Sequence, residues 1–308
     1  MTPASPRSPS PWLMDQPYLL LCLTSLFWAG NVVVGRYAAG QIPPMALSFI
    51  RWAGAFAIVL PFARTSLVRD WPLIRRHWAM MMLLSLLGVT AFNTLGYWSL
   101  QYTQALNALL LQSSSPLYVA LFSLLLFGIR LTWAQTLGIT ISLTGVLIIL
   151  LRGDPSTLFS IQLNKGDVGY TIALVVFGLY SALAARRPPI EPISFLAFTC
   201  GCGALFIVPF LVWEMSSGHF APVNSVTIPV LLYVAIFPSA LAYLFFNRGV
   251  ELIGANRAAP FFHLMPVFGS VMAIGLLGER FQWFHLAGYA LVLAGVIIAA
   301  RKGSASHA

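Results

Sequence analysis

Ten runs of predominantly apolar residues follow one another along the chain, separated by short loops that carry Pro, Gly, Asn or charged residues. A helix needs about 20 apolar residues to cross the ~30 Å hydrocarbon core of a bilayer. The runs lie at approximately residues 18–36, 45–63, 78–100, 105–127, 133–151, 168–185, 192–213, 228–247, 255–277 and 283–300. The chain is therefore predicted to be an all-α integral membrane protein with ten transmembrane helices.

Charged residues make up only 8% of the 308 residues, whereas a water-facing surface needs roughly a quarter to a third. This scarcity excludes a soluble enzyme, a nucleic-acid-binding domain and a disordered scaffold. The net charge of +9 is explained by basic residues that orient helices in a membrane, and not by a nucleic-acid partner. The expected partners are the lipid bilayer and a small-molecule substrate.

The 17 basic residues are distributed unevenly over the loops and tails. With a cytoplasmic N-terminus, twelve lie inside, Arg51 lies within the second span, and four lie outside, namely Arg36, Arg152, Lys165 and Arg280. This bias predicts that both termini are cytoplasmic. The Pro- and Ser-rich residues 1–16 are expected to form a disordered tail, and residues 302–308 a second tail.

The two halves of the chain resemble each other when one is shifted by 150 residues. Between 128–148 and 278–298, eight positions are identical, where composition alone would give roughly two. They are Gly128/Gly278, Arg130/Arg280, Trp133/Trp283, Gly138/Gly288, Leu143/Leu293, Gly145/Gly295, Val146/Val296 and Ile148/Ile298. Each repeat holds five helices, an odd number, so the second copy is predicted to be inverted, as in secondary transporters. The repeats span residues 17–152 and 167–301, joined by a linker at 153–166.

Short motifs follow one another in a specific order along the two halves. They are Leu26-Phe27-Trp28-Ala29-Gly30-Asn31, Ile42-Pro43-Pro44, Tyr102-Thr103-Gln104-Ala105-Leu106-Asn107-Ala108, Gly166-Asp167, Phe177-Gly178-Leu179-Tyr180, Gly254-Ala255-Asn256 and Leu277-Gly278-Glu279-Arg280. In this order they resemble the EamA domain of the drug/metabolite transporter superfamily. The resemblance implies a basket-like exporter of the bacterial inner membrane, with helices 1–4 and 6–9 around a central cavity and helices 5 and 10 outside it. The aromatic stripes are most similar to the YddG-like exporters of aromatic and other amino acids. One departure is Ile129, which stands where the second half keeps Glu279.

Polar residues at membrane depth are costly against lipid, so they are expected to face the interior. Several share single helical faces with aromatic residues. The predicted substrate-binding residues are Trp28, Asn31, Asn93, Tyr97, Gln112, Tyr180, Tyr243, Asn247 and His263. The alternative is that these side chains join neighbouring helices by hydrogen bonds.

Three further residues are candidates for roles in transport. Pro116 and Pro266 fall at matching positions of the two halves, where kinked helices point to a transport site, although ordinary proline kinks are equally compatible. Arg51 lies about two turns from the end of the second span. Snorkelling to the membrane surface is one explanation for it, and binding of a substrate carboxylate or a gating role is the other.

All eight acidic residues lie in tails, loops or helix ends. Without a carboxylate at mid-membrane, export of lipophilic cations and carboxylate-driven proton antiport are disfavoured. The pair Cys200 and Cys202 has no nearby His or carboxylate to complete a metal set, so we expect no metal and no cofactor.

The sequence therefore favours an exporter of amino acids, especially aromatic and other hydrophobic ones, that works by alternating access between the two half-bundles. The alternatives are an exporter of other small metabolites or drugs, and an uncoupled facilitator or channel. An integral-membrane enzyme is the least favoured, because no nucleophile–base pair or acidic cluster is recognisable. A monomer is expected, with a dimer as the alternative if the glycines of helices 5 and 10 pack between chains.

Overall fold

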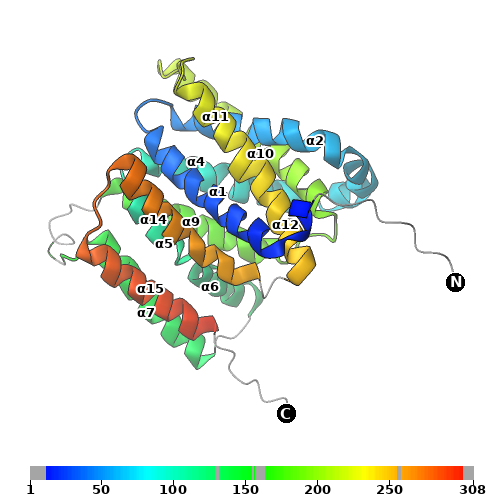
Figure 1. Cartoon of the computed structure of the whole chain (residues 1–308). Coiled ribbons are helices and arrows are strands. Elements are labelled where there is room, and N and C mark those ends of the chain that lie inside the picture. Colours follow the sequence, from blue (N-terminus) through cyan, green and yellow to red (C-terminus); the bar gives the residue numbers. More distant parts are fainter. Residues whose placement is uncertain (1–11, 129–131, 155, 157–163, 255–257, 301–308) are drawn as a thin grey trace, which may run out of the picture.

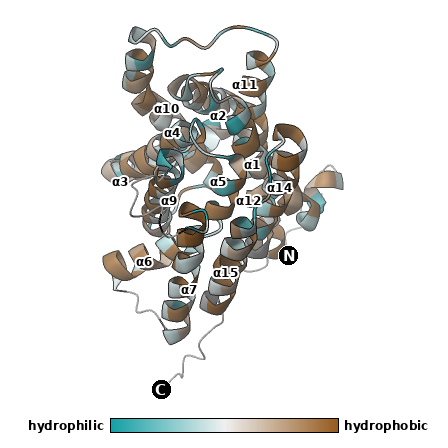
Figure 2. Ribbon diagram, turned by 90° about the vertical axis from the view of Figure 1, so that its left-hand side faces the viewer, coloured by the Kyte–Doolittle hydropathy of each residue, from teal (hydrophilic) through white to brown (hydrophobic). Residues whose placement is uncertain are grey.

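The computed structural model describes residues 12–128, 132–154, 156, 164–254 and 258–300, and all of its regular elements are helices (Figure 1). Ile129 of the sequence comparison and Asn256 lie outside the described residues. Most of the ribbon carries apolar or neutral residues (Figure 2). Charged residues gather at the helix ends and in the loops, as expected for helices surrounded by lipid.

The first half contains five helical spans, of which one includes a π-helix and another is bent. Its elements are α1 (Pro17–Tyr37), α2 (Pro44–Arg76), α3 (Trp78–Leu84), the π-helix η2 (Ser85–Ala91), α4 (Phe92–Leu100), α5 (Ala105–Gln112), α6 (Ser115–Phe127) and α7 (Trp133–Leu150). A short 3₁₀ turn, η1 (Trp12–Asp15), precedes them. The segments α3, η2 and α4 form one continuous span, and α5 and α6 meet at a bend of 42°.

The second half repeats this order. Its elements are α9 (Lys165–Ala184), α10 (Pro192–Ser216), α11 (Thr227–Ala235), the π-helix η3 (Ile236–Leu241), α12 (Ala242–Ile253), the 3₁₀ helix η4 (Ala259–His263), α14 (Leu264–Leu277) and α15 (Trp283–Ala300). Within the described residues, seven helices are long and apolar enough to cross a membrane, and the bent α5–α6 pair makes an eighth. Two shorter apolar helices, Phe261–Leu277 and Trp283–Ile298, occupy the ninth and tenth predicted positions. The predicted all-helical membrane architecture is confirmed.

One helix is much longer than predicted. We expected the second span to end near residue 63, but α2 continues to Arg76. The apolar run stops at Arg64 because charged residues begin there, yet the helix goes on with one buried side. Ile74 is buried against Met81 and Phe195 of neighbouring helices, whereas Arg75 is exposed. A window of continuous apolar residues misses such an amphipathic extension.

The structure repeats local distortions at the 150-residue offset. The π-helix at 85–91 in the third span has a counterpart at 236–241 in the eighth. Gly128 and Gly278 both end their helices in the left-handed conformation, with φ of 64° and 67°, which glycine adopts without strain. The two halves therefore share their backbone geometry at these positions.

The helices α7 and α15 lie side by side at one edge of the bundle in both views (Figures 1 and 2). Their glycines meet in crossed pairs: Gly145 faces the backbone of Gly288, and Gly295 faces that of Gly138. Residue numbers rise along one helix as they fall along the other, so the two helices are antiparallel. This is the contact that an inverted repeat produces, and it places the glycines in an interface within the chain.

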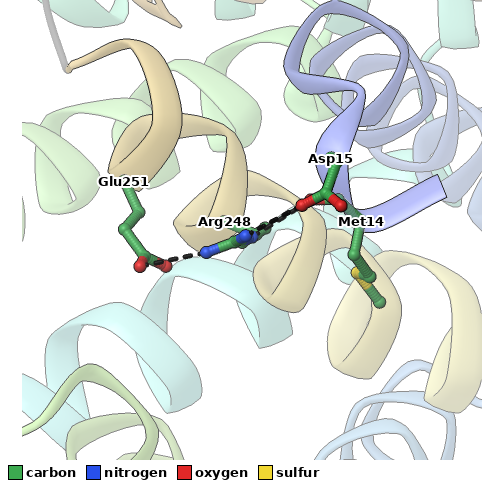
Figure 3. A network of polar contacts seen from close by, with 4 residues as sticks. All are labelled: Met14, Asp15, Arg248 and Glu251. Carbon is green, nitrogen blue, oxygen red and sulfur yellow. Dashed lines mark hydrogen bonds and ion pairs between the residues drawn. The ribbon is translucent and has the colours of Figure 1, made fainter. Parts of the chain in front are cut away.

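The loop between α1 and α2 marks one end of the bundle, which we call the outer end because the charge bias predicts that it faces outward. At the opposite end, Arg248 of α12 holds the turn that precedes α1 (Figure 3). Its guanidinium donates to the Met14 carbonyl oxygen at 3.0 Å and contacts the carboxylates of Asp15 and Glu251 at 3.1 and 3.0 Å.

Candidate functional site

Arg51 of α2 is buried in the middle of the bundle, with only 4% of its surface exposed. Its Nε donates to the Ser239 hydroxyl at 2.7 Å, and its Nη1 donates to the Asn93 Oδ1 at 2.8 Å and to the Tyr97 hydroxyl at 3.2 Å. The guanidinium carbon lies 4.5 Å from the centre of the Trp52 ring. Because the Arg51 side chain is buried, it does not snorkel to the membrane surface. None of its hydrogen-bond partners carries a negative charge, so they do not neutralise the guanidinium.

The groups around Arg51 are themselves held in place. Tyr97 donates to the Asn31 Oδ1 at 2.6 Å. Asn93 donates to the carbonyl oxygens of Gly88 and Val89 at 2.8 and 3.1 Å. A π-helix shifts backbone carbonyls out of the regular ladder and is frequent at functional sites, and here η2 provides the acceptors that orient Asn93. The Asn93 oxygen is thereby turned toward the guanidinium.

The second π-helix completes the site from the other half of the chain. Ser239 of η3 donates to the Val234 carbonyl oxygen at 2.8 Å, which leaves its own oxygen to accept from Arg51. Pro238, also in η3, accepts a hydrogen bond from the Trp28 indole at 3.0 Å. The Arg51 network therefore lies between the two repeat-related π-helices and joins both halves of the chain.

An aromatic cluster adjoins this network. Trp28 stacks on Phe262 with ring centres 5.4 Å apart and meets Tyr243 edge-on at 5.6 Å. Tyr243 in turn lies 6.5 Å from Trp52, whose ring borders Arg51. Trp28 and Tyr243 are only half-buried, so apolar ring faces remain available close to a cation.

The structure brings together Trp28, Asn31, Arg51, Asn93, Tyr97 and Tyr243 of the predicted site residues. The others are placed differently. Gln112 accepts from the Tyr170 hydroxyl at 3.0 Å, and Tyr180 packs on Phe177, 6.0 Å away between ring centres. Asn247 and His263 are half-buried, and neither side chain makes a hydrogen bond to a described residue.

The two prolines lie at the starts of helices. Pro116 is in the first turn of α6, just after the bend, which therefore falls at Ser113 and Ser114 and not at the proline itself. Pro266 is the third residue of α14 and follows the 3₁₀ helix η4. The fourth span thus changes direction next to Pro116, and the ninth span changes from a 3₁₀ helix to an α-helix next to Pro266.

Sequence reasoning missed a buried polar cluster near the outer end. Asp167 accepts from the Asn107 amide at 3.1 Å and from the Thr103 hydroxyl, and the other end of the Asn107 amide accepts from His285 at 2.7 Å. The remaining ring nitrogen of His285 accepts from the Gln282 backbone at 3.0 Å. Asn107 and Asp167 both stand in the EamA-like motifs, which was the available signal, but no local pattern links them to His285.

Two other carboxylates near the outer end accept from backbone amides. Glu279 accepts from the amides of Ala105 and Leu106, each at 2.8 Å. Glu214 accepts from the amides of Met45 and Ala46 at 3.1 and 2.9 Å. Among the described residues, no group of three or more His, Cys, Asp or Glu is arranged to hold a metal ion.

The Arg51 network at the centre of the bundle can bind an anion. The second terminal nitrogen of Arg51 makes no hydrogen bond to a described residue, and a guanidinium binds carboxylates well.

Comparison with known proteins relates the chain to membrane transporters. An uncharacterized transporter of Bacillus subtilis, YyaM, is 26% identical over 92% of both chains. A probable terminal-alkyne amino-acid exporter of Streptantibioticus cattleyicolor is also 26% identical over 92% of both. A biotin transporter of Salmonella typhimurium is 23% identical over 90% of this chain and 91% of its own. A crystal structure aligns with 92% of this chain and 97% of its own at a TM-score of 0.61 and 18% identity, which shows a shared fold.

The profile of the EamA-like transporter family matches residues 16–151 and 164–301, one match in each half. These matches cover most of the chain and coincide with the two sets of helices related by the 150-residue offset. The protein is thus a multi-pass membrane transporter with two EamA halves, a member of the EamA-like transporter family.

Proposed function

We propose that the protein exports amino acids, above all aromatic and other hydrophobic ones, across a bacterial inner membrane by alternating access between its two halves. One observation carries this proposal: Arg51 is a buried cation whose hydrogen-bond partners are all neutral. A charge at membrane depth is costly unless it is paired. A substrate carboxylate would supply the missing anion, in a site that joins both halves.

The surroundings of Arg51 suit the rest of such a substrate. The rings of Tyr243 and Phe262 lie 5.6 and 5.4 Å from the Trp28 ring between centres, and aromatic rings contribute large apolar surfaces on which another ring can pack. Pockets for small molecules typically combine such apolar walls with a few polar groups that fix orientation. The relative described as a probable amino-acid exporter is consistent with this assignment.

Lipophilic cations are a poorer match. Asp167, Glu214 and Glu279 each accept hydrogen bonds from backbone or side-chain donors, and each lies at or beyond a helix end. None of them faces Arg51 in the centre. A second candidate function is transport of another carboxylate-bearing metabolite, which the biotin-transporting relative favours; Arg51 would serve it in the same way.

The decisive experiment is uptake by proteoliposomes that contain the full chain. Labelled phenylalanine is compared with labelled phenylethylamine, which has the same ring and amine but lacks the carboxylate, and with labelled biotin. The expected result is transport of phenylalanine and little transport of phenylethylamine. Arg51→Gln should lower phenylalanine transport at least about tenfold, because a charge-assisted hydrogen bond is lost.

The matched control is Arg75→Gln, which removes an exposed arginine from the end of the same helix. Equal transport of phenylalanine and phenylethylamine by the unaltered protein would contradict recognition of the carboxylate. Transport of biotin alone would favour the second candidate. Uphill accumulation under a pH gradient would identify proton coupling and argue against an uncoupled facilitator.

Orientation and assembly belong to the same proposal. We propose that both termini lie in the cytoplasm, and that the protein acts as a monomer because the glycines of α7 and α15 pack within one chain. A reporter enzyme fused after Ala308 that is active only in the cytoplasm tests the first point. Light scattering of the detergent-solubilised protein tests the second, with a dimer as the contrary result.

A further inference from the structure

A cavity of about 770 Å³ opens at the outer end, and no residue of the Arg51 network lines it. It is bordered by the end of α1, the start of α5, the end of α7 and the loop between α14 and α15. Three arginines line it: Arg36, Arg152 and Arg280. Arg36 and Arg152 come from the first half and Arg280 from the second, so the cavity is shared by both halves.

These arginines are three of the four basic residues that the charge bias places outside. The fourth, Lys165, has its ammonium 3.6 Å from the centre of the Tyr102 ring and is not among the residues that line the cavity. Membrane proteins keep Arg and Lys away from their outer loops. Three exceptions that meet in one cavity therefore call for a ligand-based explanation.

The residues that line the cavity carry more positive than negative charge. Glu279 is the acidic residue in the lining, and its two oxygens accept from the backbone amides of Ala105 and Leu106, each at 2.8 Å. Within the described part of the chain, none of the three arginines forms an ion pair. The lining thus holds three positive charges against one negative charge. The buried Asp167, which lies near enough to Arg152 to interact with it electrostatically, is already engaged by Thr103 and Asn107.

The arginines also retain free donors. Arg36 uses Nη1 to donate to the carbonyl oxygens of Leu100 and Gln101 at 2.9 and 3.3 Å, which fixes the side chain and leaves its other nitrogens available. Arg152 and Arg280 are exposed, and their side chains donate to no described residue. The wall between them includes Tyr37, Leu277 and Phe284, which suits a carbon skeleton better than an inorganic ion.

We propose that this cavity is a second binding site, for a small organic anion that carries two carboxylates. Guanidinium groups bind carboxylates in a bidentate manner, and two negative charges match the excess of the lining. An anion held by Arg152 and Arg280 would tie the outer ends of the two halves together. The site is independent of the proposed transport site at Arg51.

Succinate binding to the detergent-solubilised full chain tests the proposal, measured by calorimetry and by the rise in unfolding temperature at constant ionic strength. A ligand that binds only the folded state raises the unfolding temperature with concentration. The double variant Arg152→Gln/Arg280→Gln should weaken succinate binding at least about tenfold, because charge-assisted hydrogen bonds are lost. Arg51→Gln should leave succinate binding unchanged, which separates this site from the proposed transport site.

The matched control is Arg75→Gln/Arg76→Gln, which removes two exposed arginines at the other end of the bundle. Equal weakening in both double variants would reduce the effect to general charge attraction and overturn the proposal. The absence of succinate binding by the unaltered protein would also overturn the proposal. Tighter binding of inorganic phosphate than of succinate would overturn the carboxylate assignment. Arg152→Lys/Arg280→Lys, which keeps the charges, should retain binding and guards against a variant that fails to fold.

Discussion

The carbonyl oxygen of Gly288 lies 2.5 Å from the point at which any side chain at position 145 would place its Cβ atom. The relation is reciprocal, because the carbonyl oxygen of Gly145 lies 2.9 Å from the corresponding point at Gly288. Two helices of different halves thus touch through their backbones. Small residues allow such close approach in membranes, where van der Waals packing drives helix association.

We predict that Gly145→Ala separates α7 from α15 and lowers the free energy of unfolding by about 1–3 kcal/mol, the usual cost of overpacking. Thermal unfolding of the detergent-solubilised protein measures this. The control is Gly275→Ala in α14, where an added Cβ meets nothing within 4 Å. If both variants unfold at the temperature of the unaltered protein, the backbone contact is not important for stability.

A second contact between the halves joins Glu279 to the first turn of α5. The residue before α5, Gln104, makes no side-chain cap, so Glu279 supplies the cap from the other half at 2.8 Å to two amides. We predict that Glu279→Ala costs about 1–2 kcal/mol, from the lost cap and the lost interaction with the helix dipole. Glu279→Gln should cost less, because one acceptor remains.

Thermal unfolding again provides the measurement. The control is Glu251→Ala, since Glu251 is 69% exposed and its ion pair with Arg248 lies on the surface, where such pairs contribute about 0–1 kcal/mol. A loss for Glu251→Ala as large as that for Glu279→Ala would argue against a specific capping role.

Much of the fold was predictable because the bilayer imposes it. Apolar runs of membrane-spanning length identified the helices, and the offset of 150 residues identified the inverted halves, down to the helix-ending Gly128 and Gly278. The length of α2 was not predictable from apolar runs, because its last turns bury the Ile74 side chain but also carry several charged residues. The bend at Ser113 arises before the proline that signalled it.

The candidate site was predictable only in part. Arg51 stood out because arginine is rare at membrane depth, and Asn93 and Tyr97 followed from one helical face. Ser239 was less obvious, since its hydrogen bond with Arg51 depends on a π-helix that no residue pattern predicts. The pairing of Asn107 with His285 joins residues 178 positions apart, and helical periodicity carries no information across such a distance.

The turn before α1 yields a further prediction. Arg248 links α12 to Met14 and Asp15, and its side chain is partly buried (Figure 3). Arg248→Ala should make residues 12–15 more accessible to proteases while changing the free energy of unfolding by less than about 1 kcal/mol. Limited proteolysis measures this, with Arg64→Ala, an exposed arginine of α2, as the control. Equal cleavage rates in both variants would contradict the anchoring role.

The buried amide of Asn107 gives the sharpest prediction of stability. It accepts from His285 at 2.7 Å and donates to Asp167 at 3.1 Å, so both of its ends are committed. Asn107→Asp keeps the shape but replaces the donor by a carboxylate oxygen facing Asp167. We expect a loss of about 3 kcal/mol or more at neutral pH, the cost of an uncompensated buried charge. Protonation of one carboxylate relieves the repulsion, so the loss relative to the unaltered protein should shrink as pH falls. Unfolding curves at pH 7.5 and about pH 5 test the sign. For Asn107→Leu, which introduces no second carboxylate, the loss should change less between the two pH values than it does for Asn107→Asp.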